Sequence, residues 1–161
     1  MTLKIGILSD THGSTHPEII ALINQCDIAL HAGDIINEKD LKALQPKQQL
    51  IAVQGNNDAH ITQLKLIEEL NLAQGKIVME HGHKHGHYQP DHDLLRSTHP
   101  DAKVIIYGHT HKQVIDNQKT PWVINPGAAG KVRNHGGSKC LVIEIKNTEE
   151  WLITPFIFDQ N

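Results

Sequence analysis

Two histidines stand one residue apart in the stretch YGHTHKQ, directly after an apolar run: His109 and His111. Imidazole is a common metal ligand and a common acid or base near neutral pH. A short His-x-His pair on a loop is just as often solvated surface, so the pair indicates a function only if other ligand-type residues accompany it. The chain contains 13 histidines, and this excess favours a metal or acid–base role for some of them.

Ligand-type residues recur at the ends of other apolar runs. Asp10 and His12 follow the first run, Asp34 the second, Asn56 the third and His81 a fourth. Each turn is ordinary by itself, because Gly-Asp and Gly-Asn are common turn sequences and Asp is a frequent helix cap. With the His-x-His pair, five runs end in Asp, Asn or His. We therefore interpret these residues as one set of metal ligands.

The elements that would position these residues alternate in the first third of the chain. The continuous apolar run of the first segment predicts a strand buried on both faces. In the segment that follows, apolar residues recur at helical spacing. We expect strands over 3–8, 27–34 and 49–58, with helices over 16–25 and 37–46. This order predicts a parallel βαβ sheet. Ligands collect beyond the carboxyl ends of such strands.

The second half of the chain is rich in strands. Residues 68–83 predict a hairpin that turns at Gln74-Gly75, and 90–100 predict a short helix capped by Asp91. A strand leads into the His-x-His pair, and two further hairpins turn near 117–118 and 147–148. We therefore predict an α/β fold in which two mixed β-sheets pack face to face with helices outside, a four-layer αββα sandwich. Residues 1–161 are expected to form a single domain.

Composition excludes several classes of protein. A chain of 161 residues with 39% hydrophobic and 20% charged residues fits one globular domain with a core. A net charge of −3 without a basic face makes nucleic acid an unlikely stable partner. Two distant cysteines, Cys26 and Cys140, fit a reducing compartment. No apolar run reaches ~18 residues, so we expect no membrane span and a cytoplasmic protein.

The combined pattern resembles the calcineurin-like metallophosphoesterase superfamily. The short length is similar to its small YfcE-type phosphodiesterase subgroup, as is the stretch Asn125-Pro126-Gly127. The resemblance covers nearly the whole chain and implies a single metallophosphoesterase domain. The motifs that carry it are Asp10-x-His12, Gly33-Asp34, Gly55-Asn56-x-Asp58, His81 and Gly108-His109-Thr110-His111.

The resemblance implies two divalent ions, ~3.5–4 Å apart in such sites, with Asp34 bridging them. Asp10, His12 and His111 would complete one site; Asn56, His81 and His109 would complete the other. Imidazole and oxygen ligands without thiolate suit Mn²⁺, Fe²⁺, Zn²⁺ or Ni²⁺, and we expect Mn²⁺ first. The implied activity is hydrolysis of a small phosphodiester by in-line attack of a metal-bridging hydroxide. The subgroup resemblance also implies a homo-oligomer.

One position departs from the superfamily pattern. Asn57 stands where many members have His and the small subgroup often has Cys. An amide can donate a hydrogen bond but cannot donate a proton to a leaving group. Asp58 would orient Asn57, and His83 is the nearest replacement acid. We therefore expect fast cleavage of esters with acidic leaving groups and slow cleavage of esters of plain alcohols.

Two other functions compete with the enzyme. The fold serves as a protein scaffold in the retromer's metallophosphoesterase-like subunit, so a weak or inactive metal-binding scaffold with a protein partner is the alternative. Only Asn57 favours it, whereas the complete ligand set favours the enzyme. Metal buffering by the His-rich segment 81–93 would require neither Asp10 nor Asn56.

For several residues outside the ligand set we expect structural or surface positions. We expect His31 to pack behind the ligands, Trp122 and Trp151 to lie in the core or at an interface, and 125–127 to form a structural loop. Arg133 is either a contact for phosphate or a solvated side chain. Most histidines of the central segment are expected to be solvated or to line the substrate mouth: His85, His87, His92 and His99.

Overall fold

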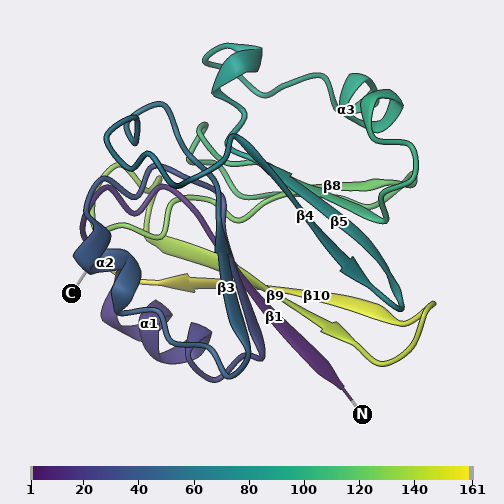
Figure 1. The fold of residues 1–161 in the computed structure, drawn as a ribbon, viewed down its shortest axis with the longest axis horizontal. Helices are drawn as coiled ribbons and strands as arrows, with labels where there is room; N and C mark the ends of the chain where they lie inside the picture. Colours follow the sequence, from purple (N-terminus) through teal and green to yellow (C-terminus); the bar gives the residue numbers. More distant parts are fainter. Residues whose placement is uncertain (1, 160–161) are drawn as a thin grey trace.

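A computed structural model describes residues 2–159, which fold into two five-stranded sheets (Figure 1). The strands of the first sheet lie in the order β10-β9-β1-β2-β3. β1, β2 and β3 are parallel, whereas β9 and β10 run antiparallel to their neighbours. The bounds are β1 (Leu3–Leu8), β2 (Ile28–His31), β3 (Gln49–Ala52), β9 (Ser138–Ile145) and β10 (Trp151–Phe158).

The second sheet has the order β4-β5-β6-β8-β7. Its central strands β5, β6 and β8 are parallel, and the edge strands β4 and β7 are antiparallel to them. Both sheets are therefore mixed, as predicted. The bounds are β4 (Ile67–Leu72), β5 (Gly75–Glu80), β6 (Val104–Ile106), β7 (Val114–Asp116) and β8 (Trp122–Asn125).

Helices cover the outer faces of both sheets (Figure 1). α1 (Pro17–Ile23) and α2 (Glu38–Lys42) lie on the first sheet, and α3 (His92–Thr98) lies on the second. Asp91 caps α3 as predicted, because its side chain accepts from the backbone N–H groups of the first turn. A 3₁₀ turn, η1 (His83–His85), follows β5.

Three hydrophobic clusters lie between the four layers of the fold and hold them together. The largest lies between the sheets and joins Ile5 and Ile7 of β1 to Met79 of β5 and Ile106 of β6. A second cluster lies between α1 and the first sheet, and a third lies between α3 and the second sheet. The αββα sandwich is therefore confirmed. Trp151 is buried in the central cluster, and Trp122 packs against it, as predicted.

The structure differs from the predicted elements in length more than in kind. The third strand ends at Ala52, not near 58. Val53 N makes a last hydrogen bond to the His31 carbonyl of β2, and Val53 then forms an isolated bridge with Lys65 as the chain leaves the first sheet. α2 is a five-residue turn of helix and is shorter than predicted. The β4–β5 hairpin turns at residues 73–74, one residue earlier than expected.

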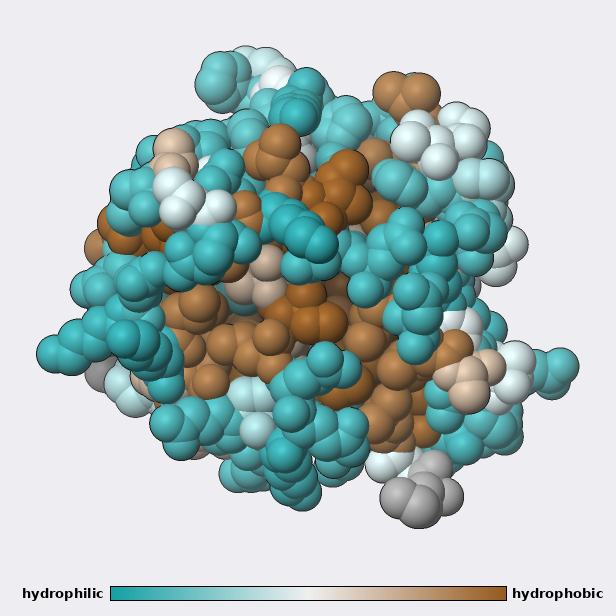
Figure 2. All heavy atoms as spheres, in the orientation of Figure 1, coloured by the Kyte–Doolittle hydropathy of each residue, from teal (hydrophilic) through white to brown (hydrophobic). Residues whose placement is uncertain are grey.

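The remaining hairpins turn where the sequence indicated, between β7 and β8 and between β9 and β10. Asn147 accepts from the N–H groups of Glu149 and Glu150 and so builds the second turn. Within residues 2–159, no helix is long and apolar enough to cross a membrane. Hydrophobic atoms reach the surface in a hollow on the face that carries β3 and β4 (Figure 2).

Candidate metal centre

The loops that follow neighbouring parallel strands are fastened to one another within each sheet, and His109 N donates to Asp10 Oδ2 at 3.0 Å between the two sheets. Asp10 N donates to the carbonyl of Gly33, and His12 N donates to the carbonyl of Asp34, at 2.9 and 3.0 Å. In the second sheet, Gly108 N donates to the carbonyl of His81 at 2.9 Å. Side chains that follow different strands are thereby brought to one place, which is the expected position of a ligand site in such sheets.

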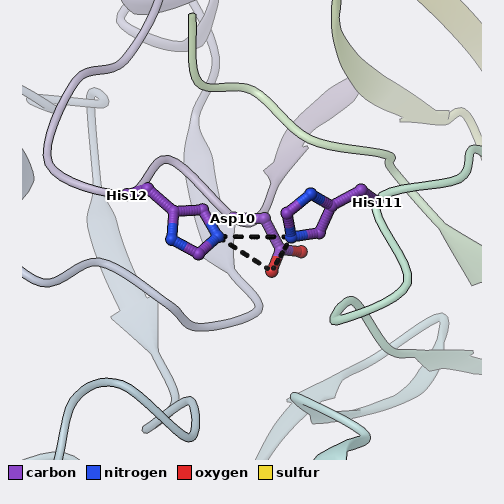
Figure 3. A group of neighbouring side chains, drawn as sticks. All are labelled: Asp10, His12 and His111. Atoms are coloured by element: carbon purple, nitrogen blue, oxygen red, sulfur yellow. Dashed lines mark hydrogen bonds and ion pairs between the residues drawn. The ribbon is translucent and has the colours of Figure 1, made fainter. Parts of the chain in front are cut away.

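Asp10, His12 and His111 form the first group of potential ligands (Figure 3). His111 Nε2 lies 3.3 Å from Asp10 Oδ1, and His12 Nε2 lies 3.8 Å from the same oxygen. The two Nε2 atoms are 3.2 Å apart. Two imidazoles and one carboxylate thus direct one atom each toward a common point, as ligands of a single cation do.

Asp34, His81 and His109 form the second group, whose potential ligand atoms all lie within 4.8 Å of one another. Asp34 faces both groups: its Oδ1 is 3.5 Å from His81 Nε2, and its Oδ2 is 3.7 Å from His12 Nε2. A carboxylate with one oxygen toward each group has the placement expected of the bridging ligand that the family resemblance implies.

Hydrogen bonds to carbonyl groups fix the orientation of two of these imidazoles. His81 Nδ1 lies 2.7 Å from the carbonyl oxygen of Ala32, and His111 Nδ1 lies 2.7 Å from that of Arg133. A carbonyl can only accept, so the proton is on Nδ1 in both rings. In the neutral ring, Nε2 then has its lone pair directed into the centre, which is the arrangement that metal-binding histidines adopt.

Five of the seven predicted ligands have left-handed backbone conformations. Such φ values are uncommon outside glycine and cost roughly 1–3 kcal/mol each, so they persist where the surrounding structure holds them. The strain is concentrated in the loops of the centre. The φ angles are 54° at Asp10, 47° at His12, 58° at Asp34, 70° at His109 and 64° at His111.

Unpartnered polar atoms indicate that the centre fits a cation. Among the described residues, four buried side-chain atoms have no hydrogen-bond partner: Asp10 Oδ1, His81 Nε2, His83 Nδ1 and Trp151 Nε1. The first two are potential ligand atoms, and they lie 3.7 Å apart. Leaving such atoms unsatisfied is costly. A divalent ion in the first group would satisfy the Asp10 oxygen, and one in the second group would satisfy the His81 nitrogen. The donor atoms are oxygen and imidazole nitrogen, which suits borderline transition metals.

The carboxylates and imidazoles of the centre shift one another's pKa values. Burial alone raises the pKa of Asp34, but its contacts with His81 and Asn57 outweigh burial and hold the pKa below the ordinary value. Burial lowers the pKa of His81, yet the two nearby carboxylates raise it overall. Because a ligating imidazole must be deprotonated, ion binding here releases protons and weakens as the pH falls.

The segment after β3 differs from the expectation in detail. Asn57 donates to Asp34 twice, from the backbone N–H at 3.0 Å and from Nδ2 at 2.9 Å. Asn56 is exposed on the same turn. Asp58 was expected to orient Asn57, but the recorded partners of its carboxylate are backbone N–H groups, at Gly55 and at residues 35–36. It ties the loop after β3 to the loop after β2.

His83 lies beside the second group. Its ring centroid is 5.5 Å from that of His81 and 6.3 Å from that of His109. Burial lowers the pKa of His83, and the positive charge of His81 adds to this effect. A cavity of about 200 Å³ adjoins it, with Leu66 and Ile67 on one wall and residues 80–85 on the other.

Several histidines of the central segment form pairs with carboxylates. His92 contacts Asp116 through Nδ1 at 2.6 Å and the Tyr107 hydroxyl through Nε2 at 3.0 Å. His85 contacts Glu80. The expectation of a solvated side chain was therefore wrong for His92, whose side chain is 9% exposed, because its pairing with Asp116 was not recognised in the sequence. His85 is exposed, as expected, although it contacts Glu80. Such pairing also argues against metal buffering by this segment.

Other residues pack behind the ligands. The sequence predicted the positions of some of them but not of others. His31 is fully buried between the Thr11 hydroxyl and the N–H of Gly33, as predicted. Asn125 donates to the loop that carries the His-x-His pair, which confirms a structural role. Ser9 was missed: its buried hydroxyl donates to Asp10 Oδ2 at 2.7 Å. The sequence did contain a signal for this contact, since Ser9 is a polar residue directly before the carboxylate at the end of the strand.

Comparison with known proteins decides the family. The sequence pattern of the calcineurin-like phosphoesterase superfamily domain matches residues 3–148. This chain belongs to the calcineurin-like phosphoesterase superfamily. It is 34% identical over 141 residues to a phosphodiesterase of Methanocaldococcus jannaschii, an alignment that covers 78% of this chain and 83% of that protein.

Solved structures share the fold of this phosphoesterase family member. A single mutant of Vps29 from Entamoeba histolytica matches with a TM-score of 0.83 at 20% identity, covering 96% of this chain and 92% of that one. A structure described as a novel archaeal phosphodiesterase matches with a TM-score of 0.72 at 23% identity, covering 96% of this chain and all of that one. The predicted membership of the superfamily is confirmed.

Proposed function

We propose that this phosphoesterase is a phosphodiesterase that binds two divalent transition-metal ions, with Mn²⁺ expected first. The observation that carries the proposal is Asp34, which directs one carboxylate oxygen toward each of two ligand groups. The phosphodiesterase relative supports the substrate class. We include Asn56 as a ligand of the second group, although its amide does not take part in the recorded contacts with Asp34.

The residues of the centre have distinct tasks in this proposal. The two ligand groups would hold the ions, which would supply Lewis-acid charge and a water of lowered pKa for in-line hydrolysis. Asn57 holds Asp34 through two hydrogen bonds and contributes no proton. His83 is the proposed proton donor to the leaving oxygen, because its ring adjoins the ligand groups and can carry a proton. Asp58 keeps the two loops together.

The proposal is tested by hydrolysis of bis-p-nitrophenyl phosphate. Metal-stripped protein should be inactive, Mn²⁺ should restore turnover, and Asp34→Asn should reduce kcat by about a hundredfold or more, as loss of electrostatic stabilisation does in other enzymes. Asp101→Asn removes an exposed carboxylate that pairs with Lys76, and it serves as the matched control. Absence of turnover with Mn²⁺, Fe²⁺, Zn²⁺ and Ni²⁺ would contradict the proposal.

The alternative is a metal-binding scaffold for a protein partner. The likeness in fold to Vps29 favours it, as does the hydrophobic hollow over β3 and β4, where Ile51 and Leu72 pack against the core. An inactive protein that retains a partner on this face would support the scaffold. We also propose a cytoplasmic location, since Cys26 and Cys140 are free and buried, and self-association as a homo-oligomer.

A further inference from the structure

A cavity of about 390 Å³ opens beside the metal centre on the side of the His-x-His pair. No carboxylate is among its described lining residues, which are His87, His109, Thr110, His111, Arg133 and His135. The cavity beside His83 is different, because apolar side chains form one of its walls. The two spaces that flank the centre therefore favour chemically different groups.

Arg133 supplies the permanent positive charge of this cavity. Its Nη2 lies 3.2 Å from His12 Nδ1. An imidazole that binds an ion through Nε2 keeps its proton on Nδ1, so both atoms are then donors and cannot form a hydrogen bond with each other. Within residues 2–159, the arginine that pairs with carboxylates is Arg96, not Arg133. The guanidinium therefore has donors to offer to a ligand.

The loop that carries Arg133 is held firmly in place. Lys139 Nζ donates to the carbonyl groups of Asn134, His135 and Gly137. Asn134 is buried, and its Nδ2 donates to the carbonyl of Gly130 at 3.1 Å. The Arg133 carbonyl accepts from His111, so the loop is fastened to the centre itself. An arginine on a fixed backbone loses less conformational freedom on binding than one on a mobile loop.

We propose that this cavity is a subsite for a second phosphate carried by one ester arm of the substrate, and that Arg133 recognises that phosphate. Guanidinium groups bind phosphate through charge-assisted, often bidentate hydrogen bonds. A diester would then lie across the centre with its phosphorylated arm toward Arg133 and its other arm toward the apolar wall beside His83. The inference rests on the proposed phosphodiesterase activity and adds its substrate class.

The first test uses two p-nitrophenyl diesters whose second arm is a propyl chain ending in a phosphate or in a methyl ether. With Mn²⁺-loaded protein, kcat/KM should be higher for the phosphate-ended ester. Arg133→Met should reduce the ratio of the two kcat/KM values by about tenfold or more, the effect of losing one charge-assisted hydrogen bond. Lys131→Met removes a charge from the same loop outside the cavity, and it should leave the ratio within about twofold.

A binding measurement separates this inference from the proposed function. In metal-free protein Nη2 can donate to His12, but the Arg133 guanidinium keeps four further N–H donors. Inorganic phosphate added to metal-free protein should therefore shift the ring signals of His87 and His135 in NMR spectra, with saturation, and Arg133→Met should abolish the shifts. Hydrolysis of the ether-ended ester with an unchanged ratio in Arg133→Met would overturn the subsite and leave the phosphodiesterase intact. If neither ester is hydrolysed, the proposed function fails. Absence of the phosphate-induced shifts then overturns the subsite as well.

Discussion

At the scale of single residues, the centre depends on polar atoms that restrain the ligands from behind. Ser9 donates to Asp10, the Ala32 carbonyl accepts from His81, and Asn57 donates to Asp34. Each contact fixes the direction of a carboxylate or an imidazole before an ion arrives. Such preorganisation raises affinity for the ion, because less conformational freedom is lost on binding.

Asn57 is the residue whose replacement is most informative for catalysis. Asn57 supplies no proton, and burial lowers the pKa of the proposed donor His83, so His83 replaces the missing acid only in part. The rate should therefore fall steeply as the pKa of the leaving group rises. Asn57→His should flatten this dependence and raise kcat for alkyl esters by about tenfold or more, within the range of general acid catalysis. The measurement is kcat for diesters with leaving groups of graded pKa. A flat dependence in the natural protein would refute this account.

His31 should make stability depend on pH. Burial lowers its pKa from 6.5 to about 4. Because the unfolded chain takes up this proton at higher pH, protonation favours unfolding. The stabilisation is complete above about pH 6.5 and decreases as the pH falls toward 4, by about 3 kcal/mol in all. Urea unfolding between pH 7.5 and 4 should show a smaller loss in His31→Gln. Equal losses in both proteins would contradict the prediction.

At the scale of elements, the loops approach one another so closely that glycine is required. A Cβ atom on Gly108 would overlap Ser9 Oγ and lie 2.9 Å from Asp10 Oδ2. A Cβ on Gly55 would overlap Asp34. Gly108 thus allows the loops of the two sheets to meet, and Gly55 allows the loops after β2 and β3 to meet within the first sheet.

Gly108→Ala should therefore displace the Asp10 side chain and reduce the free energy of unfolding by about 2 kcal/mol or more. It should also weaken Mn²⁺ binding, which calorimetry can measure. Gly86→Ala is the matched control: its added Cβ meets nothing within 4 Å, although φ is 97°. That variant should lose about 1–3 kcal/mol through backbone strain and bind Mn²⁺ normally. Equal Mn²⁺ affinity in the two variants would count against this role of Gly108.

The elements themselves were largely predictable, since apolar runs and turn residues are local signals. β1 was predicted with its observed bounds, and the hairpin turns were close to their observed positions. β3 was overestimated, because the run continues as Val53-Gln54 after the strand has left the sheet. Periodicity indicates which residues are apolar, but neighbouring strands decide where hydrogen bonding stops.

At the scale of the whole molecule, an ion that binds only the folded chain should raise its stability. At an Mn²⁺ concentration of about 100 times Kd, the gain is about 2.7 kcal/mol. For a chain of this length, the melting temperature should then rise by roughly 5–10 °C and fall again with a chelator. Asp34→Asn should reduce the shift, as scanning calorimetry can measure. A melting temperature that changes with neither Mn²⁺ nor chelator would contradict the proposal of a metal centre.

The sequence alone determined the family, the αββα layers and the residue types at the strand ends, because strand periodicity, turn residues and ligand spacing are local properties. Tertiary structure decided which way side chains point. Asn57 rather than Asn56 contacts Asp34, and Arg133 reaches His12 across 121 residues of sequence. The direction of a loop side chain depends on single φ angles and on contacts with distant segments. A local sequence pattern predicts neither of these.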